Sequence, residues 1–319
     1  MDTAAIQQAV DRAFSENDPE GRQRGTRAVV VVHEGRIVAE RYADGFDADT
    51  PQLGWSMAKS VTHAIAGRLV DQGVIAVADA SLLPAWDGDP RADITIDDLL
   101  RMTPGLEWDE TYALGSTITN MLYLESDMGG FAAAQPLAHD VGGYQQYSSG
   151  TTNLLCDVLH QRSGTGEELA ADLVFRPLGM ASAVLEPDTT GGLVCSSYLW
   201  ATPRDWARFG LWFAQNGEWE GRQLLPPDWV DYSTSTIDIA GEEEGYGAHW
   251  WVNRRADESL VMPDVRADAF WASGHDGQRV FVIPSADLVV VCMGFKPEIG
   301  SSELGFEQLL TDLIGAVTP

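Results

Sequence analysis

The stretch Gly54-Trp55-Ser56-Met57-Ala58-Lys59-Ser60 stands where a helix is expected to begin. Apolar residues continue from it at every fourth position until Gly73 ends the run: Met57, Val61, Ile65 and Leu69. This spacing predicts an amphipathic helix with a glycine stop. Residues three apart share one face of a helix, so Ser56 and Lys59 are expected to touch.

A serine and a lysine in this arrangement suit nucleophilic catalysis. A serine hydroxyl attacks well only when a neighbouring group takes its proton, and a lysine can do so only when burial or a nearby cation keeps it neutral. The helix N-terminus adds backbone N–H groups that would stabilise an oxyanion. Ser-x-x-Lys alone occurs by chance about once in an ordinary chain of this length. Lys59 and Lys296, however, are the only lysines here, which favours a chemical role for the pair.

Composition limits the partners that the chain could bind. It has 319 residues, 45% of them hydrophobic, which is enough for one large domain or two intertwined ones. The formal net charge is -28. Nucleic acid and anionic membranes attract basic surfaces, so neither is expected as a partner. The oligomeric state stays open.

The cysteines and the N-terminus indicate a cytoplasmic protein. Cys156, Cys195 and Cys292 are odd in number and each lies in an apolar run, so we expect them to be reduced core residues. No signal peptide is visible, and no apolar run approaches the ~20 residues of a membrane span. Because no Cys or His residues have metal-ligand spacing, we expect neither a metal nor a cofactor.

Strand patterns occur near both ends of the chain. A helix is expected at 3–16, followed by two strands at 27–33 and 36–42. Further strands are expected at 245–252, 267–273, 279–283 and 288–293, before a closing helix with apolar residues from Phe306 to Val317. The economical solution is an α+β fold with an antiparallel sheet built from both chain ends and an inserted helical domain. We place the sheet domain at 1–54 and 191–319, the helical domain at 55–190 and the active site in the cleft between them.

Three short motifs occur in the same order along the chain as three motifs of a known enzyme family. Ser56-Met57-Ala58-Lys59, Tyr147-Ser148-Ser149 and His275-Asp276-Gly277 resemble the Ser-x-x-Lys, Tyr-x-Asn and Lys-Thr-Gly elements of the penicillin-recognising serine hydrolases. Within that family the chain looks most like the class C β-lactamase-related group, which includes carboxylesterases, D-amino-acid peptidases and 6-aminohexanoate-dimer hydrolases. The connecting text 94–106, 175–180 and 201–210 is also similar to family text, so the resemblance covers roughly residues 27–317. It implies a β-lactamase-like fold.

The resemblance also implies a role for each motif residue. Ser56 would attack a carbonyl and become acylated, with Lys59 and Tyr147 as the acid–base pair; which of the two accepts the proton stays open. The backbone N–H groups of Ser56 and Gln278 would form the oxyanion hole. The remaining candidates for substrate contact are His275, Gly277, Ser149 and Asp127, the last as a residue at the mouth of the site that would meet a substrate amine.

These residues predict a serine hydrolase that acts on a small ester or amide. The alternative is a non-catalytic, penicillin-binding-like ligand sensor or assembly protein, and a lesser alternative is a β-lactamase. His275 stands where the β-lactamases have a lysine, so we expect weaker attraction of an anionic β-lactam. The loop from Glu107 to Tyr112 could roof a pocket, but the composition favours a solvated loop.

Overall fold

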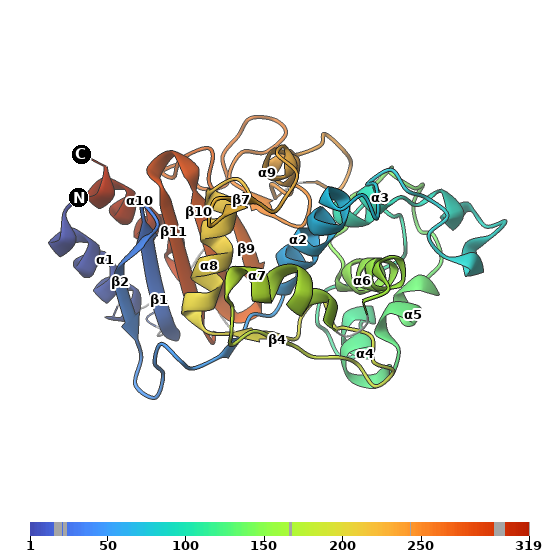
Figure 1. Ribbon diagram of the computed structural model, residues 1–319, viewed down its shortest axis with the longest axis horizontal. Coiled ribbons are helices and arrows are strands. Elements are labelled where there is room, and N and C mark those ends of the chain that lie inside the picture. The colour runs from blue at the N-terminus through green and yellow to red at the C-terminus, as the bar shows by residue number, and fades with distance from the viewer. Residues whose placement is uncertain (16–20, 22–23, 166–167, 243, 297–303, 319) are drawn as a thin grey trace.

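A computed structural model describes residues 1–15, 21, 24–165, 168–242, 244–296 and 304–318. A twisted sheet covered by helices forms one end of the molecule, and mainly helical segments form the other (Figure 1). The sheet has six strands in the order β2-β1-β11-β10-β9-β8. It therefore combines strands from both ends of the chain, and the expected α+β architecture is confirmed.

All neighbouring strands of this sheet are antiparallel. Their bounds are β1 Thr26–His33, β2 Arg36–Tyr42, β8 Trp251–Val252, β9 Phe270–Gly274, β10 Gln278–Ile283 and β11 Leu288–Gly294. β1 pairs with β11 in the register Val30 to Val291. This pairing joins the first and last strands of the chain, so the sheet closes only when both ends are present.

The sequence of β1 explains why the sheet is covered on both faces. Successive side chains of a strand point to opposite faces, and the run Ala28 to Val32 is apolar at every position. Val29 and Val31 pack in one core with α1 (Thr3–Ser15) and α10 (Phe306–Val317). Ala28, Val30 and Val32 belong to the other core, which includes α8 (Pro203–Ala214) and α2 (Met57–Asp71). A strand buried on both faces needs such a continuous apolar run.

The two termini lie close together beside the sheet (Figure 1), where Asp2 N donates to Ala316 O at 2.7 Å. The helices expected at 3–16 and 306–317 are present as α1 and α10; residue 16 lies outside the described residues. The helix expected after Ser56 is α2, with Ser56 as its N-cap.

The segments far from the sheet are mainly helical (Figure 1). Thr95 and Asp98 form a capping box that starts α3: the Asp98 carboxylate accepts from Thr95 N at 2.9 Å, and Asp98 N donates to Thr95 Oγ1 at 3.0 Å. The helices of this region are α3 Ile96–Leu100, α4 Thr117–Leu124, α5 Met128–Ala133, α6 Ser149–Ser163, the π-helix Ala171–Phe175 and α7 Arg176–Leu178, with 3₁₀ turns at Pro84–Trp86 and Pro90–Asp93.

Shorter elements connect these regions. They are α9 Trp229–Thr234, β3 Gln52–Leu53, β4 Val184–Leu185, β5 Leu199–Ala201, β6 Glu218–Trp219 and β7 Arg222–Gln223, with 3₁₀ turns at His275–Gly277 and Pro284–Ala286. The strand expected at 245–252 is wrong for most of its length, because only Trp251 and Val252 are extended in a ladder. His249 has a φ of 57° and Tyr246 pairs with Trp251, so the chain turns back on itself there.

Two of the three cysteines correct the prediction of reduced thiols. Cys156 on α6 and Cys195 form a disulfide across 39 residues, whereas Cys292 is buried and free. The pairing arises because the segment before β5 packs along α6, and a contact between residues so far apart leaves no signal in the spacing. Disulfides are rare in the cytosol, so the cysteines no longer support a cytoplasmic location.

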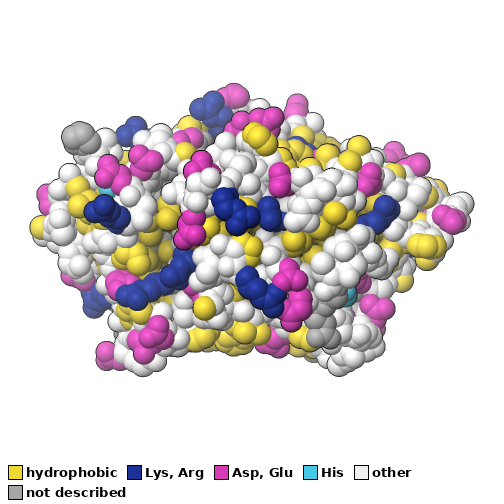
Figure 2. Space-filling view, viewed as in Figure 1, with side chains coloured by type: hydrophobic (Ala, Val, Ile, Leu, Met, Phe, Trp, Pro, Cys, Tyr) yellow, Lys and Arg dark blue, Asp and Glu magenta, His cyan; other side chains and the backbone are white. Residues whose placement is uncertain are grey.

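Charged side chains are distributed over the surface. On the face shown in Figure 2, acidic, basic and apolar side chains are interspersed. Several arginines are paired with acids, as Arg204 is with Glu40 at 2.5 Å. Among the described residues, no helix is long and apolar enough to cross a bilayer.

Candidate active site

Ser56 is presented by a tight backbone turn just before α2. Trp55 has a φ of 49°, in the left-handed region that non-glycine residues rarely adopt. A Cβ on Gly54 would lie 2.4 Å from the Trp206 ring, and one on Gly274 would lie 2.1 Å from Gly54 O. Gly54 therefore makes room for the Trp206 ring, and Gly274 lets β9 approach the start of α2. Gly274 thus makes room for the turn that presents Ser56.

Lys59 lies beneath Ser56 and is only 1% exposed. Its Nζ donates to Ser56 Oγ at 3.0 Å, Ser149 Oγ at 2.8 Å and the backbone oxygen of Ser196 at 3.2 Å. An ammonium has three donors, and here each has an acceptor. Burial lowers the pKa of Lys59 to about 8, and the nearby charge of Glu110 acts in the opposite direction. The expected contact between Ser56 and Lys59 is thus present.

Tyr147 lies over the lysine, with Lys59 Nζ 4.8 Å from the centre of its ring. The Tyr147 ring packs edge-on against Tyr246, with 5.7 Å between ring centres, and at a tilt of 38° against Trp251, with 5.5 Å between ring centres. Burial raises the pKa of Tyr147 well above its usual range, although the neighbouring Ser56 hydroxyl lowers it. The phenol therefore keeps its proton at neutral pH.

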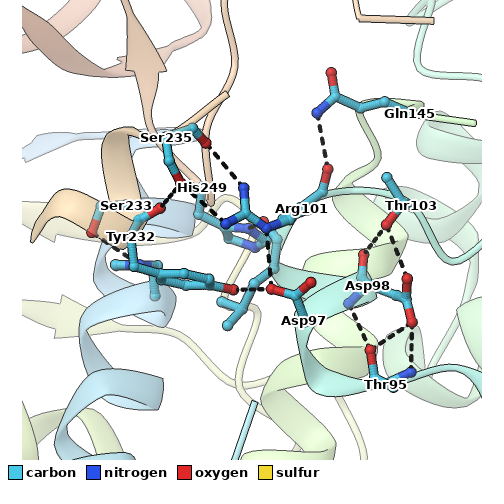
Figure 3. A network of polar contacts seen from close by, with 12 residues as sticks. Thr95, Asp97, Asp98, Arg101, Thr103, Gln145, Tyr232, Ser233, Ser235 and His249 are labelled. Atoms are coloured by element: carbon cyan, nitrogen blue, oxygen red, sulfur yellow. Dashed lines mark hydrogen bonds and ion pairs between the residues drawn. The ribbon is translucent and has the colours of Figure 1, made fainter. Parts of the chain in front are cut away.

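A polar network fixes the segment that carries Tyr147 (Figure 3). Gln145 Nε2 donates to Arg101 O at 3.0 Å, and Gln146 N donates to Met102 O at 2.8 Å. Arg101 in turn donates to Ser235 O at 2.9 Å and to Asp97 at 3.1 Å. These bonds connect the end of α3 to the loop before α6. The backbone that carries Tyr147 toward Lys59 is therefore held in place by hydrogen bonds.

A cavity of about 270 Å³ opens above Ser56. Its lining combines predicted and unpredicted residues: Ser56, Glu110, Tyr112, Tyr147, Trp251, Ser273, Gly274, His275, Asp276, Gly277, Arg279, Lys296 and Leu304. Four of the predicted site residues thus meet in one cavity, with Lys59 and Ser149 buried directly below. Within the described ranges, no three His, Cys, Asp or Glu side chains are grouped so that they could hold a metal ion.

The third motif forms the turn between β9 and β10. The His275 ring stacks on Tyr112, with 4.9 Å between ring centres, and its Nε2 lies 3.4 Å from Asp276 Oδ1. Burial raises the pKa of Asp276, and His275 opposes this effect. Gly277 has a φ of 91°, which favours glycine. The motif therefore brings an imidazole to the cavity mouth.

Gln278 has its side chain directed away from the cavity. Its Oε1 accepts from Gly294 N at 3.0 Å and its Nε2 donates to Gly294 O at 2.7 Å, so it fixes the turn against β11. Its predicted contribution to the oxyanion hole concerns the backbone N–H alone and stays a prediction. Asp127 is not among the residues that line the cavity: it caps α5, where its carboxylate accepts from Gly130 N at 2.7 Å.

Glu110 and Tyr112 were missed because their loop was taken as solvated. Trp108, Glu110 and Tyr112 turn inward, whereas Glu107, Asp109 and Thr111 are exposed. This is the period of two seen in extended chain, and the aromatic residues at 108 and 112 carry the signal in the sequence. Glu110 accepts from Ser149 Oγ at 2.5 Å, from Ser149 N at 3.0 Å and from Trp108 Nε1 at 2.6 Å.

Two cations in the cavity were also unexpected. Arg279 and Lys296 contribute to its lining. Arg279 Nη1 donates to the backbone oxygens of Gly274 and Gln278, at 2.9 and 2.7 Å. The view that His275 leaves the site without an attractive charge for an anion is therefore incomplete.

The fold agrees with the comparisons with known proteins. The model of the Beta-lactamase family matches residues 5–297, so the chain belongs to that family, whose relatives here are serine hydrolases. A 6-aminohexanoate-dimer hydrolase of Paenarthrobacter ureafaciens is 23% identical over 299 residues, 86% of this chain and 73% of that protein. A D-aminopeptidase of Brucella anthropi is 28% identical over 184 residues, 54% of this chain and 35% of that protein.

A solved structure shows the same fold. The Bacillus anthracis protein described as a 6-aminohexanoate-dimer hydrolase superimposes with a TM-score of 0.78 at 24% identity, covering 91% of this chain and 79% of that one.

Proposed function

We propose that this protein hydrolyses a small ester or amide through an acyl-enzyme formed on Ser56. The observation that carries the proposal is the position of Lys59, whose Nζ lies 3.0 Å from Ser56 Oγ in a buried site. With a pKa of about 8, roughly a tenth of the lysine is neutral at pH 7. The neutral amine is then within reach of the serine proton.

Lys59 is the better candidate for the proton acceptor. Burial raises the pKa of Tyr147, so little tyrosinate is present near neutral pH. Tyr147 is suited instead to act as a donor, because its ring lies beside both Ser56 and Lys59. We assign Lys59 as the base and Tyr147 as the group that returns a proton to the leaving group.

The proposed reaction has two halves. Ser56 Oγ attacks the substrate carbonyl carbon and its proton passes to Lys59 Nζ, while backbone N–H groups of Ser56 and Gln278 stabilise the oxyanion. The bond to the leaving group breaks as Tyr147 protonates that group, and Lys59 restores the phenol proton. Water then attacks the acyl-enzyme, loses a proton to the same pair and releases the acid and free Ser56.

The relatives support ester or amide substrates. Two relatives are named as a hydrolase of 6-aminohexanoate dimers and as a D-aminopeptidase. A non-catalytic ligand sensor is the rival, and a β-lactamase is the lesser alternative. The buried contact between Ser56 and Lys59 favours the enzyme, because burying a lysine costs stability and needs a compensating use.

Fluorophosphonate labelling followed by intact mass measurement tests the proposal. We expect a single adduct on the native protein and on the control Ser15→Ala, whose serine is exposed at the end of α1. Ser56→Ala should show no adduct. If the native protein stays unlabelled, or if Ser56→Ala still carries the adduct, Ser56 is not the nucleophile.

A further inference from the structure

A second cavity of about 270 Å³ lies beside the one above Ser56. Tyr147 and Trp251 contribute to the lining of both. The two rings, 5.5 Å apart at their centres, therefore stand between the nucleophile and a second space of the same size.

The chemistry of the second lining differs from that of the first. Two carboxylates, Glu242 and Glu244, line it, and of the described residues that line it none is lysine or arginine. The rest of the lining is aromatic or uncharged: Met102, Tyr144, Gln145, Gln146, Tyr147, Gly241, Tyr246 and Trp251. Carboxylates attract a cation, and aromatic faces bind one at short range. The first cavity, by contrast, contains Arg279 and Lys296.

The lining of the second cavity is held in place. Glu242 Oε1 accepts from Gly245 N at 2.6 Å and from Tyr246 N at 3.1 Å, which fixes the carboxylate while its other oxygen accepts no hydrogen bond from the described residues. Tyr144 stacks on His139 with 4.0 Å between ring centres. Gln145 is fixed on both sides, since its N donates to Ala240 O at 2.8 Å and its side chain donates to Arg101 O (Figure 3). A fixed site loses less entropy when a ligand binds.

We propose that this second cavity is a subsite for a cationic group, an alkylammonium, carried by the leaving portion of the substrate. The inference rests on the proposed function, because it takes Tyr147 as the group that protonates the leaving atom. The portion that departs then lies on the Tyr147 side, next to Glu242 and Glu244, while the acyl portion stays on Ser56. Hydrolysis would release a carboxylic acid and a cationic alcohol or amine.

Two esters of one shape test the subsite. Acetylcholine carries a quaternary ammonium in its alcohol, and 3,3-dimethylbutyl acetate has carbon in place of that nitrogen. We expect kcat/KM for the cation to exceed that for the neutral ester by about 5–30-fold at low salt, the range for a cation held by aromatic faces and partly exposed acids. The preference should weaken as salt screens the carboxylates.

A paired variant separates the subsite from the general acidity of the protein. In the double variant Glu242→Gln with Glu244→Gln, the amide oxygen at 242 can still accept from the two backbone N–H groups. The ratio of kcat/KM for acetylcholine to kcat/KM for 3,3-dimethylbutyl acetate should fall to within about 2-fold of one. The control Glu125→Gln with Glu218→Gln removes two exposed acids that line neither cavity and should keep the native ratio. Equal falls in both double variants would mean that net charge alone selects the cation.

Placing the cation on the acyl side checks the orientation. The ethyl ester of betaine should show no such preference over its neutral isostere, ethyl 3,3-dimethylbutanoate. A preference confined to the acyl-side cation would overturn the assignment to the leaving portion.

Failure of the subsite can be told from failure of the proposed function. If 4-nitrophenyl acetate is hydrolysed by a route that requires Ser56, but the cation ratio of the native protein is near one, only the subsite is wrong. If no ester is hydrolysed, choline binding to the Ser56→Ala protein still tests whether the subsite exists. The binding is measured by the quenching of tryptophan fluorescence. Binding should weaken at least about 5-fold in the Glu242 and Glu244 double variant; equal binding refutes it.

Discussion

Replacing Glu110 by glutamine should change the pH dependence of the reaction. Glu110 accepts from Ser149 Oγ at 2.5 Å, and Ser149 Oγ accepts from Lys59 Nζ at 2.8 Å. The carboxylate and the ammonium are therefore about 5 Å apart or less. The charge of Glu110 raises the pKa of Lys59 against the larger, lowering effect of burial. Removing that charge should lower the pKa below about 8.

The magnitude follows from the separation. At about 5 Å and an effective dielectric constant of 20, two unit charges interact by about 3 kcal/mol. Glu110 is only half-buried, so solvent reduces this to about 1–2 kcal/mol, and 1.36 kcal/mol corresponds to one pKa unit. We expect the pKa of Lys59 in the variant to be about 7.

The pH profile of kcat/KM for 4-nitrophenyl acetate measures this change. Because neutral Lys59 is the base in our proposal, the native rate should rise with pH through a midpoint near 8 and then level off. In Glu110→Gln the midpoint should move down by about one pH unit. The matched control is Glu107→Gln, in the same loop but exposed, and it should keep the native midpoint.

Two outcomes would contradict this account. A native rate that falls as pH rises through 8 would mean that the ammonium form of Lys59 is required, with Tyr147 as the base. An unchanged midpoint in Glu110→Gln, with Lys59 still essential, would show that the carboxylate has no electrostatic influence on the lysine.

Three further predictions concern the same site. Lys59→Ala should abolish acylation by fluorophosphonate while circular dichroism shows a folded protein; near-native labelling would remove Lys59 from the mechanism. Tyr147→Phe should lower kcat by about 10²–10⁴, the range for a positioned acid–base group, and a loss of less than a few-fold in steady-state kinetics would leave Tyr147 only a packing role. A short-chain ester or small amide should exceed a chromogenic cephalosporin in kcat/KM by a wide margin; parity would show that Arg279 and Lys296 supply the anion attraction that His275 lacks.

The sequence predicts best where one segment contains the whole pattern. The periodic apolar residues of α2 and α10 lie within a single element, and the Thr95–Asp98 capping box spans four residues. The antiparallel sheet from both ends was also predictable, because strand patterns occur only near the termini and β1 is apolar at successive positions.

Features that depend on contacts between distant segments were not predictable. The disulfide between Cys156 and Cys195 depends on how the chain packs along α6. Lys296 and Arg279 reach the cavity only because β11 ends and β10 begins beside it. Glu110 was within reach of prediction, since its inward direction follows from the alternation around it, but an acid in a polar loop is usually solvated.

The three hydrogen bonds of Lys59 also make the reactivity of the active site depend on complete folding. The acceptors come from the start of α2, the start of α6 and the backbone at Ser196. Ser149 and Ser196 are 90 and 137 residues from the lysine along the chain. A partly folded chain that lacks any one of them would leave the amine in water, where its pKa is near ~10.4 and almost no neutral form exists at pH 7. Incompletely folded molecules should therefore be chemically silent, and reactivity should return only with the last of the three segments to dock.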